Sequence, residues 1–322
     1  MATGDSADRG PIEMVRRLGE GSFGVVYKAH FPRTGEVVAV KTILLDKYGN
    51  VNRARDLISR EIKFLQKLKH DNILGCIAVQ HWSGDQPQIW MPLMSGNLTY
   101  LRERLPAVEL ETYVVKDVLE QMLCSLDYLA CRKVIHRDLN PDNILYWETG
   151  PTKYTFKLAD FGLAMNETVE DKPSGTPRYM APETMPQFSK INARQSHKLD
   201  VWALIATIAD ISPTSGFPGK MGGDYVTKET MEATWNAVVN LVLHFPFNAM
   251  KYVDPNKRAS AAQVLLYGFQ GRGLTTKRRI PPLIDESQPG NPNPQPVPGG
   301  SGRVLAISSR ALGSGPMDIC SS

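Results

Sequence analysis

Residues 134–145 have the sequence Val-Ile-His-Arg-Asp-Leu-Asn-Pro-Asp-Asn-Ile-Leu. It fits the pattern H-R-D-x-x-x-x-N, with Asp138 and Asn143 as the first and last chemically active positions after the arginine. A carboxylate can accept a proton, and carboxylate and amide oxygens are hard ligands for cations. The stretch follows a long amphipathic pattern and precedes a strand pattern, so we expect a polar loop between a helix and a hairpin.

The glycine-rich stretch at residues 19–26 is the second motif, and it fits G-x-G-x-x-G-x-V. A strand pattern over 25–31 continues from it, whereas a dinucleotide fingerprint would open a helix, so the loop is predicted to be a hairpin tip. Glycines there let backbone N–H groups approach phosphate oxygens without an obstructing Cβ atom. Taken alone, the motif also fits a plain glycine hairpin, so the other motifs must decide.

Lys41 is the third feature, because it ends the apolar strand pattern Val38-Ala39-Val40-Lys41. An unpaired charge inside an apolar strand is costly, so Lys41 is expected to have an anionic partner. Glu61 lies on a helical pattern 20 residues later. We predict an ion pair between Lys41 and Glu61 beneath the glycine loop; the alternative is a surface lysine and a solvated glutamate.

Two short motifs complete the set, Asp160-Phe161-Gly162 and Ala181-Pro182-Glu183. Several independent motifs in one order make coincidence negligible. On these residues the chain resembles the eukaryotic protein kinase superfamily, of the serine/threonine type, over about residues 12–270. The resemblance implies a two-lobed fold with ATP in the cleft, and transfer of its γ-phosphoryl group to serine or threonine hydroxyls of protein substrates.

The hydrophobic periodicity supports an α+β fold, because strand patterns come first and helical patterns dominate afterwards. Strands are expected at 13–17, 25–31, 37–43, 73–79 and 88–91, with a hairpin at 143–147 and 154–159. Helices are expected at 54–69, 111–130, from about 199 onward, 227–243 and 259–268.

The domain organisation follows from the same patterns. A flexible N-terminus at 1–11 precedes a kinase domain at 12–272, with a small β-rich N-lobe at about 12–92 and a larger helical C-lobe at about 97–272. Residues 273–322 are predicted to be a disordered tail rich in Pro, Gly and Ser, since seven of the 21 residues in 280–300 are Pro and three are Gly.

The resemblance implies roles for the residues that match the motifs. Asp138 would accept the proton of the attacking hydroxyl, and Asn143 and Asp160 would hold Mg²⁺ or Mn²⁺. Lys41 would offset charge on the phosphates. The implied ATP-binding residues are Leu18, Gly19, Gly21, Gly24, Val26, Ala39, Lys41, Glu61, Met91, Leu93, Met94 and Leu145.

Within that set, Val26 and Ala39 would form the roof over adenine and Leu145 the floor. Met91 is the candidate gatekeeper, ahead of a hinge in which Pro92 has no N–H to donate to adenine. Structural roles are also implied: Glu183 pairing with Arg258, and Asp200 bracing the catalytic loop near Arg137.

Thr176 and Asn140 complete the implied catalytic set. Thr176 lies in Gly-Thr-Pro-Arg-Tyr, which resembles serine/threonine kinases, where this threonine bonds the catalytic Asp138. Asn140 departs from the family, which usually has lysine there; asparagine can donate a hydrogen bond to Asp138 or Thr176 but supplies no charge. We expect a slower or differently tuned enzyme. The alternatives are a pseudokinase or weakly active scaffold in signalling and, less favoured, a kinase of small molecules or lipids.

Regulation is expected on the activation segment, residues 160–183. In this family an arginine such as Arg137 often binds a phosphate there, and the candidate acceptors are Thr168 and Ser174. An upstream kinase or a phosphatase would then be a partner. The other hypothesis is that nearby acidic residues neutralise Arg137 without phosphorylation; these are Glu167, Glu170 and Asp171.

Composition narrows the classes further. The 322 residues are 42% hydrophobic, which excludes disorder of the whole chain, and the net charge of +4 does not indicate a nucleic-acid partner. No apolar signal segment or membrane span is visible, and the four cysteines lack the spacing of a zinc site. We therefore expect a monomeric intracellular protein, cytoplasmic or nuclear, without a nucleic-acid partner.

Overall fold

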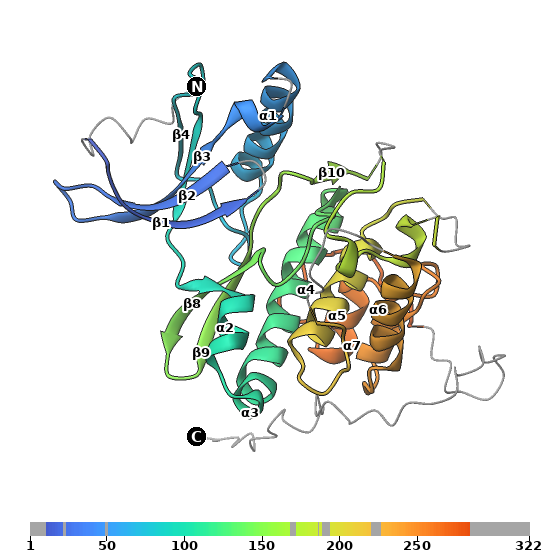
Figure 1. Cartoon of the computed structure of the whole chain (residues 1–322). Coiled ribbons are helices and arrows are strands. Elements are labelled where there is room, and N and C mark those ends of the chain that lie inside the picture. The colour runs from blue at the N-terminus through green and yellow to red at the C-terminus, as the bar shows by residue number, and fades with distance from the viewer. Residues whose placement is uncertain are drawn as a thin grey trace, which may run out of the picture.

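The computed structural model describes residues 11–21, 24–48, 51–167, 172–185, 187–188, 194–219 and 227–283. A five-stranded antiparallel sheet of order β1-β2-β3-β5-β4 forms the N-terminal part, and a mostly helical part follows it (Figure 1). The predicted α+β class is therefore confirmed. The strands are β1 Glu13–Gly21, β2 Gly24–His30, β3 Val37–Ile43, β4 Ala78–Gln80 and β5 Gln88–Pro92.

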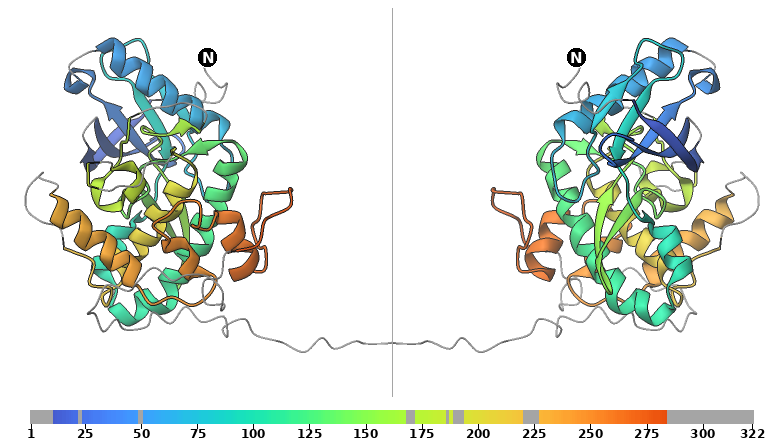
Figure 2. Two further views of the ribbon diagram at one scale, coloured as in Figure 1. Left: turned by 90° about the vertical axis from the view of Figure 1, so that its right-hand side faces the viewer. Right: turned by 90° about the vertical axis from the view of Figure 1, so that its left-hand side faces the viewer.

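Helix α1, Val51–Lys67, belongs to the same part as the sheet (Figure 2). Its apolar residues recur at helical spacing, and Ile58, Ile62 and Leu65 are buried in a core that also contains Ile43 and Ile89 of the sheet. Arg60 and Lys63 between them are exposed, whereas Glu61 is buried. The helix predicted at 54–69 is thus present, begins earlier, and places Glu61 beside Lys41 of β3.

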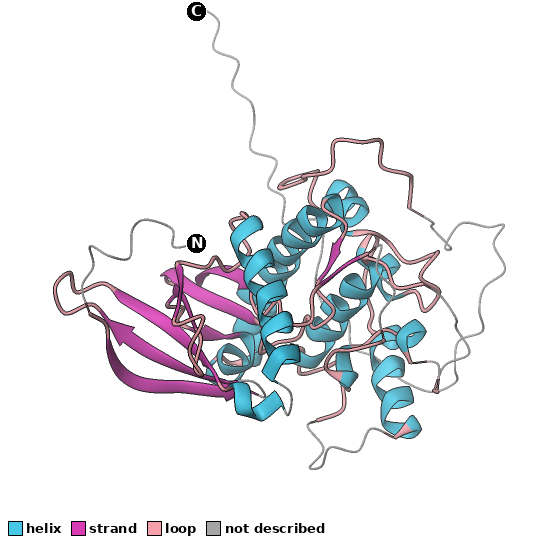
Figure 3. Ribbon diagram, turned by 90° about the horizontal axis from the view of Figure 1, so that it is seen from above, coloured by secondary structure: helices cyan, strands magenta, loops and turns pink. Residues whose placement is uncertain are grey.

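Seen from above, the long strands lie at one end of the molecule and most helices at the other (Figure 3). Residues of α4 and α5 make up much of the main hydrophobic core. Nearly every residue of α5 is buried, which explains its long apolar sequence. The helices are α2 Leu98–Arg104, α3 Ala107–Glu109, α4 Val115–Cys131, α5 Lys198–Ile211, α6 Lys228–Asn240 and α7 Ala261–Gly268. In the part of the chain that is described, no helix has the length and apolarity to cross a membrane.

Two small sheets border the helices. The three-stranded sheet has the order β6-β8-β9 and contains the predicted hairpin, and the two-stranded one pairs β10 with β7. Their bounds are β6 Gly96–Asn97, β7 Val134–Ile135, β8 Ile144–Gly150, β9 Lys153–Leu158 and β10 Met165–Asn166. The loop of residues 136–143 lies between β7 and β8, which places the first motif between two short sheets.

One local expectation was wrong, and one predicted helix is present with a different first turn. The strand predicted at 73–79 is reduced to β4, because the backbone of Asn72 and Leu74 instead bonds to Leu158 of β9, at 2.9 Å in each direction. This segment therefore ties the two parts of the chain together. The helix predicted at 111–130 begins as a separate π-helical turn, Leu110–Val114, before α4.

Residues 273–283, assigned to the tail by composition, are anchored on the helical part. The buried Asp127 carboxylate of α4 accepts the N–H groups of Thr275 and Thr276 at 2.7 and 2.9 Å. Gln263 of α7 donates to the carbonyls of Pro281 and Pro282. Backbone hydrogen bonds fix this segment although it has no periodic apolar pattern, and the remaining tail lies outside the described residues.

Candidate active site

Lys41 of β3 stands between two carboxylates. Its Nζ lies 2.9 Å from Oε1 of Glu61 on α1 and 3.6 Å from Oδ1 of Asp160. The side chains of Lys41 and Glu61 are 16% and 7% exposed, whereas that of Asp160 is 48% exposed. The predicted Lys41–Glu61 pair is present. Together with the contact to Asp160, it places β3, α1 and the Asp160-Phe161-Gly162 motif next to one another.

The electrostatics of this triad differ between the two acids. Burial raises the pKa of Glu61, and the charge of Lys41 opposes that shift. The charge of Lys41 is the main reason why the pKa of Asp160 is lowered. The same cation therefore lowers the pKa of both carboxylates, and the Asp160 side chain is half-exposed.

Asp200 of α5 holds the backbone of the loop of residues 136–143, which is called the catalytic loop below. Its carboxylate accepts the N–H of His136 at 2.8 Å and that of Arg137 at 2.9 Å. Arg137 has φ of 71°, a left-handed conformation that is strained for a residue with a side chain. Burial raises the pKa of Asp200, and its two N–H contacts oppose the shift. The brace predicted for Asp200 thus acts on the residues immediately before Asp138.

Asp138 receives donors on both carboxylate oxygens. Thr176 donates its N–H and its hydroxyl to Oδ1 at 2.8 and 2.7 Å. Asn143 donates through Nδ2 to Oδ2 at 3.0 Å and to the Asp138 carbonyl at 2.8 Å. These contacts fix the carboxylate in one orientation at the end of the loop, where it is half-buried.

Asn140 forms hydrogen bonds with both of its predicted partners, Asp138 and Thr176. Its Nδ2 donates to Oδ1 of Asp138 at 3.2 Å and to Oγ1 of Thr176 at 3.3 Å. Its Oδ1 accepts the N–H of Asp142 at 2.9 Å and that of Asn143 at 3.2 Å. The amide therefore closes the loop from 138 to 143, a function that a lysine has no acceptor to perform.

Asn143 and Asp160 present oxygen atoms suited to a divalent cation. Asp160 has φ of 61° and accepts the N–H of Gly162 at 3.1 Å, so its carboxylate is oriented by its own turn. Asn143 uses its Nδ2 on Asp138, which leaves the amide oxygen to face elsewhere. The described residues contain no cluster of three or more His, Cys, Asp or Glu that could hold a metal ion alone. This pair of oxygen donors therefore fits Mg²⁺ that is shared with phosphates.

The glycine loop begins where β1 meets β2. Gly24 must lack a side chain, because a Cβ atom there would lie 2.4 Å from the carbonyl oxygen of Thr42. Val26 pairs with Gly19 on one side and with Lys41 on the other. Gly21 ends β1, and residues 22–23 at the tip lie outside the described part.

The other residues predicted for ATP binding surround the same strands. Ala39 of β3 and Met91 of β5 lie opposite each other on neighbouring antiparallel strands. Leu93 and Met94 form the connection from β5 to β6, and Leu145 lies on β8. Leu18 on β1 is 40% exposed. Contact of any of these with adenine stays a prediction.

The activation segment is linked to the catalytic loop through Arg137. The Nη2 of Arg137 donates to Oγ of Ser174 at 2.8 Å. Gly175 has φ of 134°, and a Cβ atom there would lie 2.4 Å from the Arg137 carbonyl oxygen. The Glu167 carboxylate accepts from the backbone and Nδ1 of His197, at 3.4 and 3.3 Å. Thr168, Glu170 and Asp171 lie outside the described residues.

Glu183 and Arg258 form the predicted pair, which is fully buried. The distances from Arg258 Nη1 and Nη2 to the two carboxylate oxygens are 2.7 and 2.9 Å. The guanidinium also lies 4.9 Å from the ring of Trp202 on α5. The end of the activation segment is thereby fixed to the helical core.

Sequence reasoning missed two further carboxylates near the site. Asp142 accepts hydrogen bonds from Asn97 and Thr99, which connects the catalytic loop to the start of α2. Asp210, at the end of α5, accepts the Tyr179 hydroxyl at 2.9 Å. An aspartate inside the apolar pattern of 199–211 indicates that its carboxylate needs a hydrogen-bond or ionic partner. The pattern does not identify which residue that partner is.

Comparison with known proteins agrees with this geometry. The sequence matches the family described as the protein kinase domain over residues 12–269. The chain therefore belongs to the protein kinase family.

The relatives are serine/threonine-protein kinases. The chain is 29% identical over 293 residues to a "Probable serine/threonine-protein kinase" of Dictyostelium discoideum, covering 87% of this chain and 54% of that protein. It is 34% identical over 203 residues to "Serine/threonine-protein kinase TAO1-B" of Xenopus laevis, covering 62% and 19%. It is 29% identical over 287 residues to "Serine/threonine-protein kinase 1" of Arabidopsis thaliana, covering 86% and 32%. The chain thus spans about half or less of the length of these relatives.

Proposed function

We propose that this chain transfers the γ-phosphoryl group of ATP to serine and threonine hydroxyls of protein substrates. The arrangement around Asp138 carries the proposal, because Thr176 and Asn143 orient its two oxygens. Lys41, held by Glu61, supplies the cation that phosphate groups require. A threonine that bonds the catalytic aspartate is typical of kinases that act on serine and threonine.

In the proposed reaction, the substrate hydroxyl donates its hydrogen bond, and then its proton, to Asp138. The hydroxyl oxygen forms a bond to the γ-phosphorus, and the bond from that phosphorus to the β-phosphate oxygen breaks. The electron pair leaves with ADP, where Lys41 offsets the charge on the phosphates. Since Thr176, Asn140 and Asn143 already orient Asp138, little reorganisation is needed when the hydroxyl arrives.

Asn143 and Asp160 are proposed to hold the divalent cation, Mg²⁺ or Mn²⁺. The amide oxygen of Asn143 and the ionised carboxylate of Asp160 are hard donors of the kind that such cations prefer. When bound, the cation neutralises charge that develops on the phosphate oxygens. Lys41 lowers the pKa of Asp160, so the same residue would support the binding of both nucleotide and cation.

Phosphorylation of Ser174 is proposed to strengthen the active arrangement. Its Oγ already lies 2.8 Å from Nη2 of Arg137, so a phosphate there would place anionic oxygens beside the guanidinium. Arg137 directly precedes Asp138, and the added contacts would tie the activation segment to the catalytic loop. Thr168 stays a second candidate, to be distinguished by mass spectrometry of the purified protein.

Phosphate transfer from labelled ATP to random peptide mixtures with serine, threonine or tyrosine acceptors tests the proposed function. Asp138→Asn should lower transfer by about a hundredfold or more, the usual contribution of a positioned base, while a fluorescent ATP analogue still binds. Asp56→Asn, on the exposed side of α1, is the matched control and should transfer normally. Unchanged transfer by Asp138→Asn would refute the assignment of Asp138 as the catalytic base. Nucleotide binding without phosphate transfer by the wild type would favour the scaffold alternative.

A further inference from the structure

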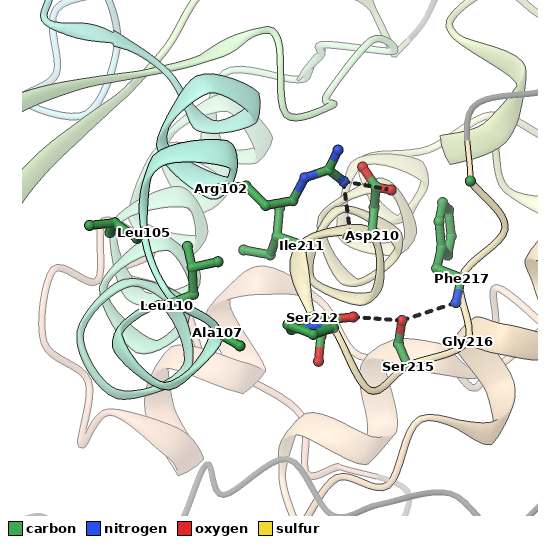
Figure 4. A pocket seen from close by; sticks show the side chains of 12 residues that line it. Arg102, Leu105, Ala107, Leu110, Asp210, Ile211, Ser212, Ser215, Gly216 and Phe217 are labelled. Carbon is green, nitrogen blue, oxygen red and sulfur yellow. Dashed lines mark hydrogen bonds and ion pairs between the residues drawn. The ribbon is translucent and has the colours of Figure 1, made fainter.

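A cavity of about 350 Å³ lies between the end of α2 and the end of α5 (Figure 4). Apolar side chains of Leu105, Leu110 and Phe217 form part of its wall. Its charged lining consists of Arg102 from α2 and Asp210 from α5. The cavity therefore combines an apolar wall with one cation and one anion.

Asp210 is already committed to internal donors. Its carboxylate lies 3.2 Å from Nη1 of Arg102 and 3.4 Å from Nη2 of Arg178, and it accepts the hydroxyl of Tyr179 at 2.9 Å. Its side chain is only 10% exposed. A basic side chain that entered the cavity would have to displace two arginines, so this carboxylate is poorly suited to bind an external cation.

Arg102 retains unused donors. Its Nη1 also donates to the Asp210 carbonyl at 3.1 Å, while among the described residues no acceptor is found for its Nε and Nη2. The side chain is 29% exposed, and Figure 4 shows the guanidinium extending from α2 above the cavity with one nitrogen directed away from Asp210. A planar guanidinium with free donors is suited to carboxylate or phosphate oxygens.

The cavity adjoins the proposed catalytic centre through one short segment. Arg178 and Tyr179 follow Thr176 by two and three residues, and Thr176 contacts Asp138. The Arg178 guanidinium lies 5.1 Å from the ring of Phe217, which stacks on Tyr179 at 6.1 Å. An extended peptide advances about 3.3–3.6 Å per residue, so a few residues suffice to connect a hydroxyl at Asp138 with a side chain in the cavity.

We propose that this cavity is a substrate subsite that takes an anionic side chain, carboxylate or phosphate, flanking the phosphorylated residue. Arg102 is the residue that would bind the anionic side chain and so determine specificity. This assignment rests on the proposed kinase function. Asp142, whose charge also acts on Tyr179, lies outside the lining and accepts from Asn97 and Thr99. Because Arg102, Arg178 and Tyr179 already engage the Asp210 carboxylate, the polar groups left for a ligand in the cavity include the remaining guanidinium donors of Arg102.

A positional peptide library tests the subsite in the full chain. Each position around a central serine carries Asp, Glu, phosphoserine, Ala, Lys or Arg in turn. The wild type should favour an anion over Lys at one or more flanking positions, by about tenfold, the effect of one charge-assisted hydrogen bond. Comparison of Asp and Glu with phosphoserine distinguishes a carboxylate ligand from a phosphorylated one.

Arg102→Gln should abolish this preference while transfer to the Ala peptide changes little. Arg104→Gln is the matched control, since Arg104 lies one half-turn further on α2 and pairs with Glu148 instead. It should keep the preference. Selection of Lys or Arg by the wild type, or an equal loss in both variants, would overturn the subsite.

A binding experiment separates this proposal from the proposed function. Fluorescence anisotropy of labelled peptides with Asp, phosphoserine or Lys at each flanking position needs no phosphoryl transfer. If transfer is absent but the anionic peptide binds and Arg102→Gln weakens it about tenfold, the subsite stands and the kinase activity fails. If transfer occurs but binding and the library show no dependence on Arg102, the subsite fails and the kinase activity stands.

Discussion

Removal of Arg258 should destabilise this protein more than removal of its partner Glu183. The side chains of the pair are 0% and 1% exposed, and two contacts join them. Arg258 donates in addition to the carbonyls of Tyr252, Val253 and Lys198, at 2.8, 3.1 and 3.0 Å. Arg258 thus satisfies four acceptor groups, whereas Glu183 satisfies one.

The expected magnitudes follow from that asymmetry. Arg258→Met leaves a buried carboxylate and three carbonyls without these donors, so the free energy of unfolding should fall by about 3–5 kcal/mol. Glu183→Gln keeps one acceptor oxygen, and Arg258 keeps its carbonyls, so a loss of about 1.5–3 kcal/mol is expected. In Arg258→Met/Glu183→Gln no buried charge of the pair remains, and the combined loss should be smaller than the sum of the single losses by about 1–3 kcal/mol.

Urea unfolding, followed by circular dichroism and tryptophan fluorescence, measures these differences. Dichroism is needed as well, because Arg258 lies over Trp202 and its removal can change fluorescence directly. Surface Lys228→Ala, whose partner Glu232 is 50% exposed, is a control that should change stability by less than about 0.5 kcal/mol. Equal losses for both single variants, or strict additivity in the double variant, would show that the reasoning about buried charge is wrong here.

Three further predictions concern the site itself. Asn140→Lys should keep or raise the rate of transfer, because it adds charge, yet lower the free energy of unfolding by about 1–2 kcal/mol, because two backbone N–H groups lose their acceptor; a large loss of rate contradicts this. Gly175→Ala should lower transfer at least tenfold, because the new Cβ atom would clash with the carbonyl of Arg137. Gly35→Ala, also at positive φ but with open space around it, should not lower transfer. Steady-state kinetics of both variants test this. The difference in free energy of unfolding between wild type and Lys41→Met should become smaller as pH falls from 7 to 5. Burial already raises the pKa of Glu61, and without the cation that lowers it Glu61 takes up a proton in the folded state. Urea midpoints in that pH range test this, and Lys41→Met/Glu61→Gln should lack the trend.

Much of the site could be predicted because its charged residues have few physical alternatives. A lysine at the end of an apolar strand requires an anion, and Glu61 on the facing helix was the available one. The pairing of Glu183 with Arg258 and the brace by Asp200 came from the family resemblance, and the contacts are present. In each case the motif fixed the two ends of a long-range contact.

The errors arose where a local pattern did not identify its partner. Residues 73–79 have the β-branched composition of a strand, but Leu74 bonds to Leu158 across the two parts of the chain instead of joining the sheet. The network around Asp210 was missed for the same reason, since Arg102 and Arg178 come from segments that no spacing rule connects to it. Periodicity reports which face is buried, and it does not report what covers that face.

Three aspartates within apolar helical patterns illustrate why a buried acid is not in itself a functional signal. Asp200 holds the catalytic loop, Asp210 orients two arginines at the cavity, and Asp127 merely fixes the segment 273–283. All three look alike in sequence, because each is a carboxylate with apolar neighbours. Their roles differ only in which distant donors reach them, and those donors become close only after both the helices and the loops have folded. The proposed function therefore rests on Asp138, where Thr176 of the activation segment meets the loop of residues 136–143. The ligand preference of the neighbouring cavity can be inferred only because the carboxylate of Asp210 already binds Arg102, Arg178 and Tyr179.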